Sequence, residues 1–240
     1  MAQIFQLTLR QLLGRWRVLL IVFLASLPTL IILLVKWQDP DGVVYNQEFV
    51  EGMIDAMIIG GIMPIVTMTI ASAAFGNELE DRTLYYLILK PIPRVHIALA
   101  KVVATFVLTA PVVVAGGVVA TALVGGSVSA VLTVGIALLA GVAAYASIFT
   151  WAGLITPRAL SYGLVYVLVW EGLLSSFLTG VRYLSVRGYT LSLLHGIDAK
   201  NFEILEDRVI AFPAAIVGAV GVALVFFFLA HYRLRTMDVP

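Results

Sequence analysis

The sequence predicts an all-α membrane protein that crosses the bilayer with six helices. Hydrophobic residues occupy 61% of the 240 positions and charged residues only 12%, and the mean hydropathy is +1.04. Soluble domains are roughly 45–50% apolar and about 25% charged, so this composition is typical of a chain that lies in lipid. The apolar segments lack the period-two alternation of barrel strands, which leaves helices as the spanning element. The sequence has no cysteine, which excludes disulfides and thiolate metal sites.

Six apolar segments approach the length of about 20 helical residues that a hydrocarbon core of about 30 Å requires. They are expected near 18–35, 56–75, 102–124, 128–151, 159–179 and 209–230. The first follows three arginines, as in a signal peptide, but it is longer than the apolar region of such a peptide and no small-x-small cleavage site follows it. We therefore expect a retained span and a single transmembrane domain over 1–240.

Residues 1–17 are expected to form an amphipathic helix before the first span. Apolar side chains recur there at helical spacing among glutamines and arginines: Phe5, Leu9, Leu12, Leu13 and Trp16. Such a helix lies in the inner membrane interface, with its arginines near anionic headgroups. The alternative is a basic leader that only sets the orientation of the first span.

The distribution of basic residues predicts that both termini are cytoplasmic. In this orientation the inside holds Arg10, Arg15, Arg17, Arg82, Lys90, Arg94, Lys101, Arg158, Arg233 and Arg235. The outside holds Lys36, Arg182, Arg187, Lys200 and Arg208. The excess of basic residues inside favours this topology over its reverse.

The segment between the second and third spans, "FGNELEDRTLYYLILKPIPR" at 75–94, has the pattern of a short cytoplasmic helix. Asn77 is a candidate N-cap with Glu80 as its capping-box partner, and acids nearby suit the positive end of a helix dipole. Pro91 would end the helix. Residues 84–89 are apolar on all sides, so one face can pack on the membrane helices and the other can bind a partner. The alternative is a loop that lies in the lipid interface.

This segment resembles the one between the second and third spans of type-2 ABC transporter permeases. In that family an acidic residue precedes a Thr-Leu pair, a leucine-rich helix, a Pro-Ile-x-Arg sequence and a lysine at the start of the next span. The matching residues here are Glu78 or Glu80, Thr83, Leu84, Pro91, Ile92, Pro93, Arg94 and Lys101. The basic N-terminal segment, the six spans and a longer outer segment, 180–208, extend the resemblance over the whole chain.

The resemblance implies a permease subunit of an ATP-driven transporter, of a class that mostly exports. The segment 77–94 would contain the coupling helix, which fits a groove on the ATP-binding subunit. The residues expected to make this contact are Glu78, Glu80, Arg82, Thr83, Leu84, Tyr85, Tyr86, Leu87, Pro91, Pro93 and Arg94.

A separate ATP-binding chain is expected because the sequence has no Gly-Lys dipeptide and therefore no phosphate-binding loop of the Walker type. ATP and magnesium would bind that subunit, in two copies, and this chain would be neither an enzyme nor a cofactor carrier. A second permease copy, identical or related, would complete the pathway in the plasma membrane. Nucleic acid is not an expected partner.

The outer segment 180–208 is expected to have two parts. Residues 183–194 are apolar enough to return toward the membrane, and the resemblance implies a re-entrant helical hairpin that caps the pathway. The polar residues that follow, 195–208, are expected to form a surface helix that leads into the sixth span.

Glu171 is the ionisable residue that lies well inside a predicted span. Carboxylates in lipid are costly and usually face a cavity or a partner, so Glu171 is the candidate pathway residue. The alternative is a structural role, in which it hydrogen-bonds neighbouring hydroxyls or reaches outer water. An ion-coupled secondary transporter that uses Glu171 remains the second function class, although no repeat relates the two halves. An intramembrane enzyme is disfavoured because His96, His195 and His231 fall at span ends or in loops.

Small residues and prolines within the spans are interpreted as packing and bending features. Small residues recur at three- and four-residue spacings that allow helices to approach closely: Gly116, Gly117, Ala120, Thr121, Gly135, Ala137, Gly141 and Ala144. Pro28, Pro64 and Pro111 are expected to bend their helices.

Overall fold

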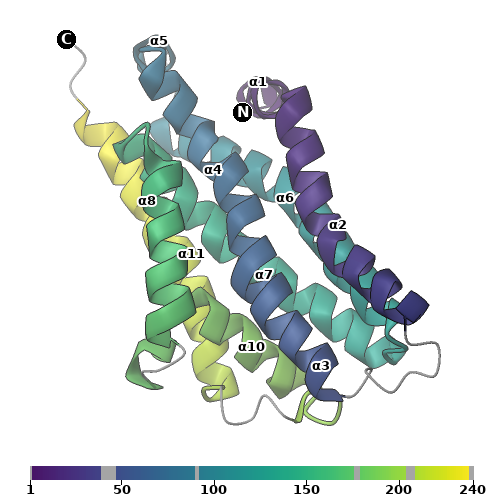
Figure 1. Ribbon diagram of the computed structural model, residues 1–240. Helices are drawn as coiled ribbons and strands as arrows, with labels where there is room; N and C mark the ends of the chain where they lie inside the picture. Colours follow the sequence, from purple (N-terminus) through teal and green to yellow (C-terminus); the bar gives the residue numbers. More distant parts are fainter. Residues whose placement is uncertain (1, 39–46, 90–91, 176–178, 204–208, 238–240) are drawn as a thin grey trace.

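The computed structural model describes residues 2–38, 47–89, 92–175, 179–203 and 209–237. These residues form a bundle of long helices with short helices at both ends (Figure 1), and no strand occurs among them. The predicted all-α membrane fold is confirmed.

The helices are, in chain order, α1 (Ala2–Leu12), α2 (Arg15–Gln38), α3 (Gln47–Gly52), the π-helix η1 (Met53–Ile62), α4 (Met63–Glu80), α5 (Leu84–Ile88), α6 (Arg94–Leu123), α7 (Val128–Ile155), α8 (Ala159–Val165), the π-helix η2 (Tyr166–Leu174), the 3₁₀-helix η3 (Thr179–Leu184), α10 (Val186–Ile197) and α11 (Phe212–Thr236). The elements α3, η1 and α4 follow one another without a break, as do α8 and η2. Pro64 stands at the start of α4, where its missing N–H fits the change from π to α hydrogen bonding.

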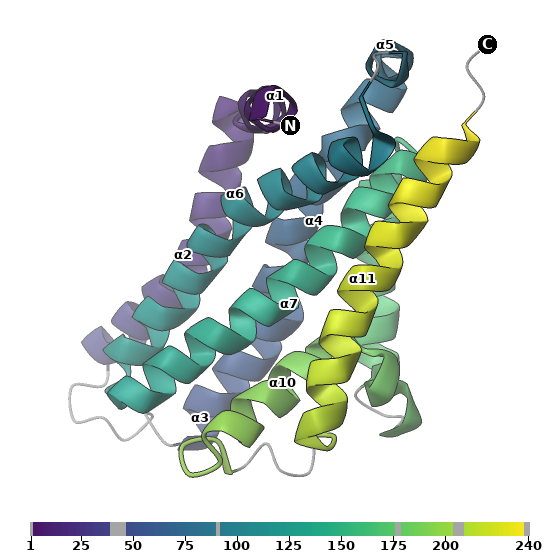
Figure 2. The same cartoon turned by 180° about the vertical axis from the view of Figure 1, so that it is seen from behind.

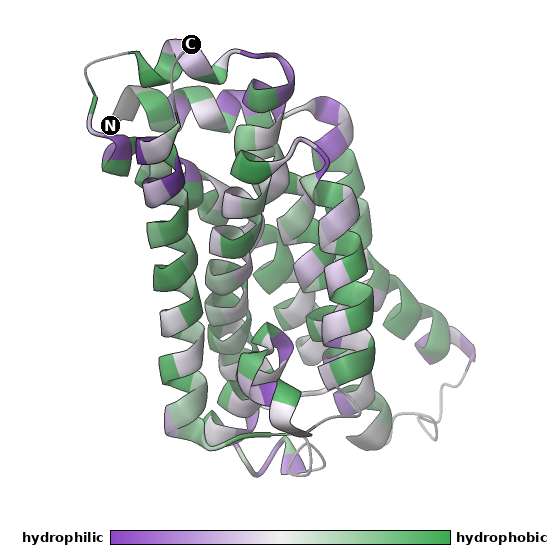
Figure 3. Ribbon diagram, turned by 90° about the vertical axis from the view of Figure 1, so that its left-hand side faces the viewer, coloured by the Kyte–Doolittle hydropathy of each residue, from purple (hydrophilic) through white to green (hydrophobic). Residues whose placement is uncertain are grey.

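Five helices in the described part of the chain are long and apolar enough to cross a membrane: α2, Phe49–Glu80, α6, α7 and α11. The expected fifth span, 159–179, is shorter than predicted. Its described helix covers Ala159–Leu174, and Thr179 already belongs to η3. The second and third spans are longer than predicted because their helices continue beyond the apolar core toward polar ends. Figure 3 shows apolar residues along the middle of the bundle and hydrophilic ones mainly toward its two ends.

Two spans form the buried centre of the bundle: the continuous helix Phe49–Glu80, which contains α4, and α7. In contrast, α2 and α11 expose most of their surface. Helix α7 contacts α4, α6, α10 and α11. Close packing at a predicted small residue is confirmed at Gly116 on α6, where a Cβ would lie 2.6 Å from the carbonyl oxygen of Ala25 on α2. Gly153 on α7, which was not among the predicted residues, makes a similar approach, because a Cβ there would collide with the carbonyl oxygen of Ser72 on α4. Gly135 makes no such close approach.

The N-terminal helix exists, but it ends earlier than the predicted range 1–17. It stops at Leu12, and α2 begins at Arg15, so Trp16 belongs to the first span and is 83% exposed. The buried side of α1 consists of Ile4, Thr8 and Leu12, one residue per turn. The expected stripe is therefore wrong in its last members, because the break at 13–14 turns Trp16 away from it.

Both termini and α5 lie at one end of the bundle, and α3 and α10 lie at the other (Figures 1 and 2). We call these the terminal end and the opposite end. At the opposite end, the segment predicted to return toward the membrane forms the last turn of η3 and then α10, a single buried helix that packs on α7 and α11. The surface helix predicted at 195–208 is wrong for the described residues, because α10 continues to Ile197 and 198–203 form turns. Residues 204–208 lie outside the described part.

Candidate functional site

The turn between α4 and α5 differs from the predicted capped helix. Asn77, Glu78 and Glu80 form the last turn of α4 instead of the first turn of a new helix. The side-chain Oδ1 of Asn77 accepts from Arg17 Nη2 at 3.2 Å, and Glu80 is exposed. The predicted capping box of Asn77 and Glu80 is therefore wrong.

Helix α4 ends in a Schellman-type motif at Arg82, which has a left-handed φ of +56°. The N–H of Thr83 donates to the carbonyl oxygen of Glu78 at 2.9 Å, which closes the characteristic six-residue turn. Glycine usually occupies the left-handed position, and arginine there is strained by roughly 1–2 kcal/mol. Because this common sequence signal is missing, the turn was not predicted.

Helix α5 has five residues and presents one face inward and one outward. Leu84, 2% exposed, and Ile88 pack inward against Phe75, Ile97 and other residues of a small core at the terminal end. The expectation that Leu84 supplies contact area to a partner is therefore corrected. Tyr86 and Leu89 face outward and are 71% and 64% exposed, while Tyr85 and Leu87 are half-buried. The predicted contacts Glu80, Arg82 and Thr83 are also exposed.

A buried ion pair ties the end of α4 to α6 beneath this turn. Lys101 Nζ lies 2.7 Å from Glu78 Oε1, donates to the carbonyl oxygen of Ala74, and lies 4.6 Å from the ring centroid of Phe75. Lys101 is fully buried and Glu78 nearly so. Glu78 and Glu80 were both candidates for the acidic residue that precedes the Thr-Leu pair. The structure separates them, because Glu78 pairs with Lys101 whereas Glu80 is exposed.

The start of α6 is fixed to the end of α11. Arg94 Nη1 donates to the carbonyl oxygens of Leu234 and Arg235 at 2.6 and 2.7 Å. These carbonyls belong to the last turn of α11, where a cation is favourable. Arg94 therefore makes contacts within the chain, in addition to any with a partner. Pro93 is exposed at the N-cap of α6, and Pro91 lies outside the described residues.

At the opposite end, Glu171 is completely buried and its carboxylate caps the N-terminus of α10. Its Oε1 accepts from the Tyr166 hydroxyl and the Val186 N–H, both at 3.0 Å. Its Oε2 accepts from the Ser185 hydroxyl and, at 3.3 Å, from the Arg187 N–H. Glu171 thus joins η2 to the beginning of α10.

Arg187 links this cap to the second span. Its guanidinium contacts Asp55 Oδ1 through Nη2 at 2.6 Å and Nε at 2.8 Å, and its Nη1 donates to the carbonyl oxygen of Glu171 at 3.2 Å. Asp55 is completely buried in η1. The pair is not apparent from the sequence, because Asp55 immediately precedes the predicted span and Arg187 interrupts an apolar segment. The sequence holds one sign of the pair: Asp55 and Arg187 each lie beside apolar residues, with no residue of opposite charge close by on the same helix.

Both π-helices meet this cluster, which consists of Asp55, Glu171 and Arg187. Asp55 lies in η1 and Glu171 in η2, so the two carboxylates of the cluster come from the two π-helices. The far end of α10 is also held, because Asp198 Oδ2 accepts from the Ser129 hydroxyl on α7 at 2.6 Å. Helix α10 is therefore fixed at both ends to the spans around it.

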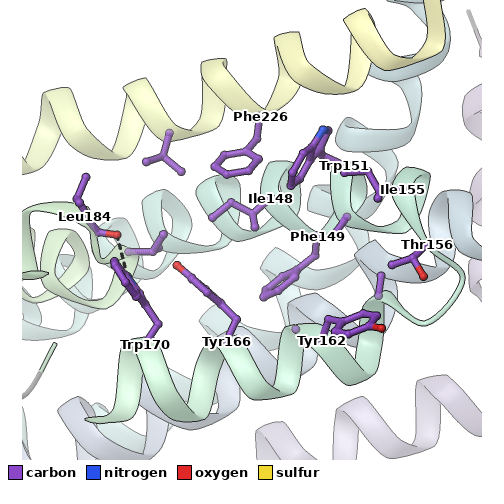
Figure 4. A pocket seen from close by; sticks show the side chains of 15 residues that line it. Ile148, Phe149, Trp151, Ile155, Thr156, Tyr162, Tyr166, Trp170, Leu184 and Phe226 are labelled. Atoms are coloured by element: carbon purple, nitrogen blue, oxygen red, sulfur yellow. Dashed lines mark hydrogen bonds between the residues drawn. The ribbon is translucent and has the colours of Figure 1, made fainter. Parts of the chain in front are cut away.

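A lateral groove of about 700 Å³ lies between α7, the continuous helix α8–η2, and α11 (Figure 4). We call it the α8–α11 groove. Its walls are mostly apolar and aromatic: Ile148, Phe149, Trp151, Ala152, Ile155, Thr156, Ala159, Tyr162, Gly163, Tyr166, Trp170, Leu184, Val186, Val222 and Phe226.

Comparison with known families agrees with these features. A family model described as ABC-2 family transporter protein matches residues 13–186, nearly three quarters of the chain. The match runs from the start of the first span to the start of α10 and includes the α4–α5 turn, Glu78, Lys101 and Glu171. Comparison with curated proteins gives no match. The chain therefore belongs to the ABC-2 transporter family and is a membrane-spanning permease subunit of an ABC transporter.

Proposed function

We propose that the chain is the permease of an ATP-driven exporter, and that α5 and its flanking turns contact a separate ATP-binding subunit. The observation that carries this proposal is the outward face of α5. Tyr86 and Leu89 are exposed at the terminal end of the bundle, on a helix whose other face is locked into the core. Aromatic residues in such positions are typical anchors of protein interfaces.

The way α5 is held supports transmission of force from a partner. A five-residue helix has little stability of its own, so its position depends on packing. Leu84 and Ile88 supply this packing, and the Glu78–Lys101 pair joins α4 to α6 directly beneath. Displacement of Tyr86 by a partner would therefore move α4 and α6 instead of being absorbed by a flexible loop.

The ATP-binding subunit would carry ATP and magnesium, because this sequence has no Gly-Lys dipeptide. Two such subunits and a second permease copy would complete the transporter in the plasma membrane. Export is the direction in which the resembled class mostly operates. Glu171 would act at the outer end of the pathway, through its hold on α10.

The terminal end is proposed to be cytoplasmic, which single cysteines in this cysteine-free chain can test. Cysteines at Tyr86 and Thr236, both exposed at the terminal end, should not react with an impermeant thiol reagent added outside intact cells. A cysteine at Ala199, exposed at the opposite end, should react. All three should react after the membrane is permeabilised. Outside labelling at Tyr86 or Thr236 would show that the topology is wrong.

Replacing Tyr86 with alanine should weaken binding of the ATP-binding subunit about thirtyfold. Truncating an aromatic anchor commonly costs about 2 kcal/mol of binding free energy, which corresponds to this factor. The measurement is the dissociation constant of the purified ATP-binding subunit for the permease in nanodiscs, together with stimulated ATP hydrolysis. Tyr183→Ala is the matched control, since Tyr183 is 55% exposed at the opposite end. Unchanged affinity and transport in Tyr86→Ala would refute the assignment and favour a loop that lies in the lipid interface.

A further inference from the structure

The α8–α11 groove has an aromatic wall that follows one face of a single helix. Tyr162, Tyr166 and Trp170 are spaced four residues apart, so they share a face of α8–η2. Figure 4 shows Tyr166 and Trp170 extending from this helix into the space below α11, with Trp170 directed toward Leu184. Helix α7 forms the floor, with Ile148 and Phe149. The groove opens on the lateral surface of the bundle, because several lining side chains, including Tyr162, are largely exposed.

The chemistry of the groove suits hydrocarbon. Two polar groups on its aromatic wall are already engaged, since the Tyr166 hydroxyl donates to Glu171 and Trp170 Nε1 donates to the carbonyl oxygen of Leu184 at 3.3 Å. The remaining wall consists mainly of aliphatic and aromatic surface. A sugar or peptide there would lose hydrogen bonds to water without replacement, whereas an acyl chain has none to lose.

The length of the groove suits a lipid acyl chain. From Ala159 to Trp170 its wall is roughly 16 Å long at about 1.5 Å per residue, comparable with one leaflet of a hydrocarbon core of about 30 Å.

A cation stands at the terminal end of the groove. Arg158 is exposed and lies between Thr156 and Ala159, which both line the groove. A guanidinium binds phosphate well. Anionic lipids are typical of the cytoplasmic leaflet, and the terminal end of the bundle is proposed to lie at that leaflet. We propose that the α8–α11 groove binds an acyl chain of an anionic phospholipid of that leaflet, with the lipid phosphate paired to Arg158.

The test compares two tryptophan substitutions on α11. Val222→Trp fills the groove, whereas Val225→Trp places the same side chain three residues away, on an exposed position outside it. Each protein is purified with palmitoyl-oleoyl phosphatidylglycerol, washed in detergent, and analysed for retained lipid by native mass spectrometry. Wild type and Val225→Trp should retain one phosphatidylglycerol per chain that Val222→Trp loses. Arg158→Gln should reduce the preference for phosphatidylglycerol over phosphatidylcholine about fivefold.

A second measurement leaves the groove intact. The chain has four tryptophans, and Trp16→Phe/Trp37→Phe leaves only Trp151 and Trp170, both in the groove. Phosphatidylglycerol with brominated acyl chains should quench their fluorescence at lower mole fractions than brominated phosphatidylcholine does. Equal quenching by the two lipids, or equal lipid retention by the two tryptophan variants, would overturn the proposal. Loss of permease pairing in Val222→Trp with lipid retention unchanged would overturn it in favour of a second copy.

Discussion

Lys101→Met is expected to destabilise the folded protein by about 3–5 kcal/mol, because it leaves Glu78 as an unpaired carboxylate in the protein interior. It also removes the donor to the carbonyl oxygen of Ala74. Methionine keeps much of the length and apolar character of the lysine stem, so the change in stability reports the loss of the charge and not a loss of packing. The measurement is the unfolding midpoint of the purified permease in detergent, together with its binding of the ATP-binding subunit.

The double variant Glu78→Gln/Lys101→Met separates the ion pair from packing. It removes both charges, so it should recover much of the stability lost in Lys101→Met, a coupling that two independent sites would not show. Lys200→Met, at an exposed lysine of the opposite end, is the matched control and should have little effect. If Lys101→Met unfolds at the same midpoint as wild type, the pair does not hold α4 to α6.

The spans and their approximate positions could be predicted because membrane burial depends on properties that composition and length record directly. Long apolar stretches must form helices in lipid, whatever their neighbours are. The ends of the helices depend instead on local geometry. Helix α4 continues past Asn77 because Arg17 and Lys101 engage its polar side chains from elsewhere in the chain. Pattern analysis of a single segment does not contain those partners.

The two π-helices illustrate a second limit. Their extra residue per turn leaves no mark in composition or periodicity over nine or ten positions. Asp55 and Glu171 are brought to Arg187 by the packing of η1, η2 and α10, which are far apart in the sequence. Glu171 could be singled out as a buried carboxylate, whereas its role as a cap could not, because the N–H groups that it accepts from lie on another element.

The sequence predicts which residues form the proposed coupling contact, but it does not predict which of them face the partner. The apolar run 84–89 has no polar face, so the sequence alone does not distinguish Leu84, which packs inward, from Tyr86, which faces outward. The direction is set by the left-handed turn at Arg82, which redirects the chain after α4. Tyr86 is therefore a sharper target for mutation than the tyrosine pair as a whole.

Glu171→Leu is expected to have the largest effect at the opposite end and to release the N-terminus of α10. Four donors would lose their acceptor: the hydroxyls of Tyr166 and Ser185 and the N–H groups of Val186 and Arg187. Each buried donor left without a partner costs about 1–3 kcal/mol, so the total is about 4 kcal/mol or more. Glu171→Gln keeps one acceptor oxygen and should lose roughly half as much. The unfolding midpoint and proteolysis of the outer segment measure this loss, and Glu203→Leu, at an exposed carboxylate, is the control.

Comparing transport with stability distinguishes the two roles of Glu171. If the residue anchors α10, transport should decline in step with the unfolding midpoint, with glutamine intermediate between glutamate and leucine. If it contacts cargo, glutamine should reduce transport while the midpoint changes little. The arrangement of donors favours the first result, because the carboxylate is completely buried and both of its oxygens are already bonded. A Glu171→Leu protein that unfolds and transports like wild type would exclude both roles, and would mean that the Arg187–Asp55 pair is enough to hold the N-terminus of α10.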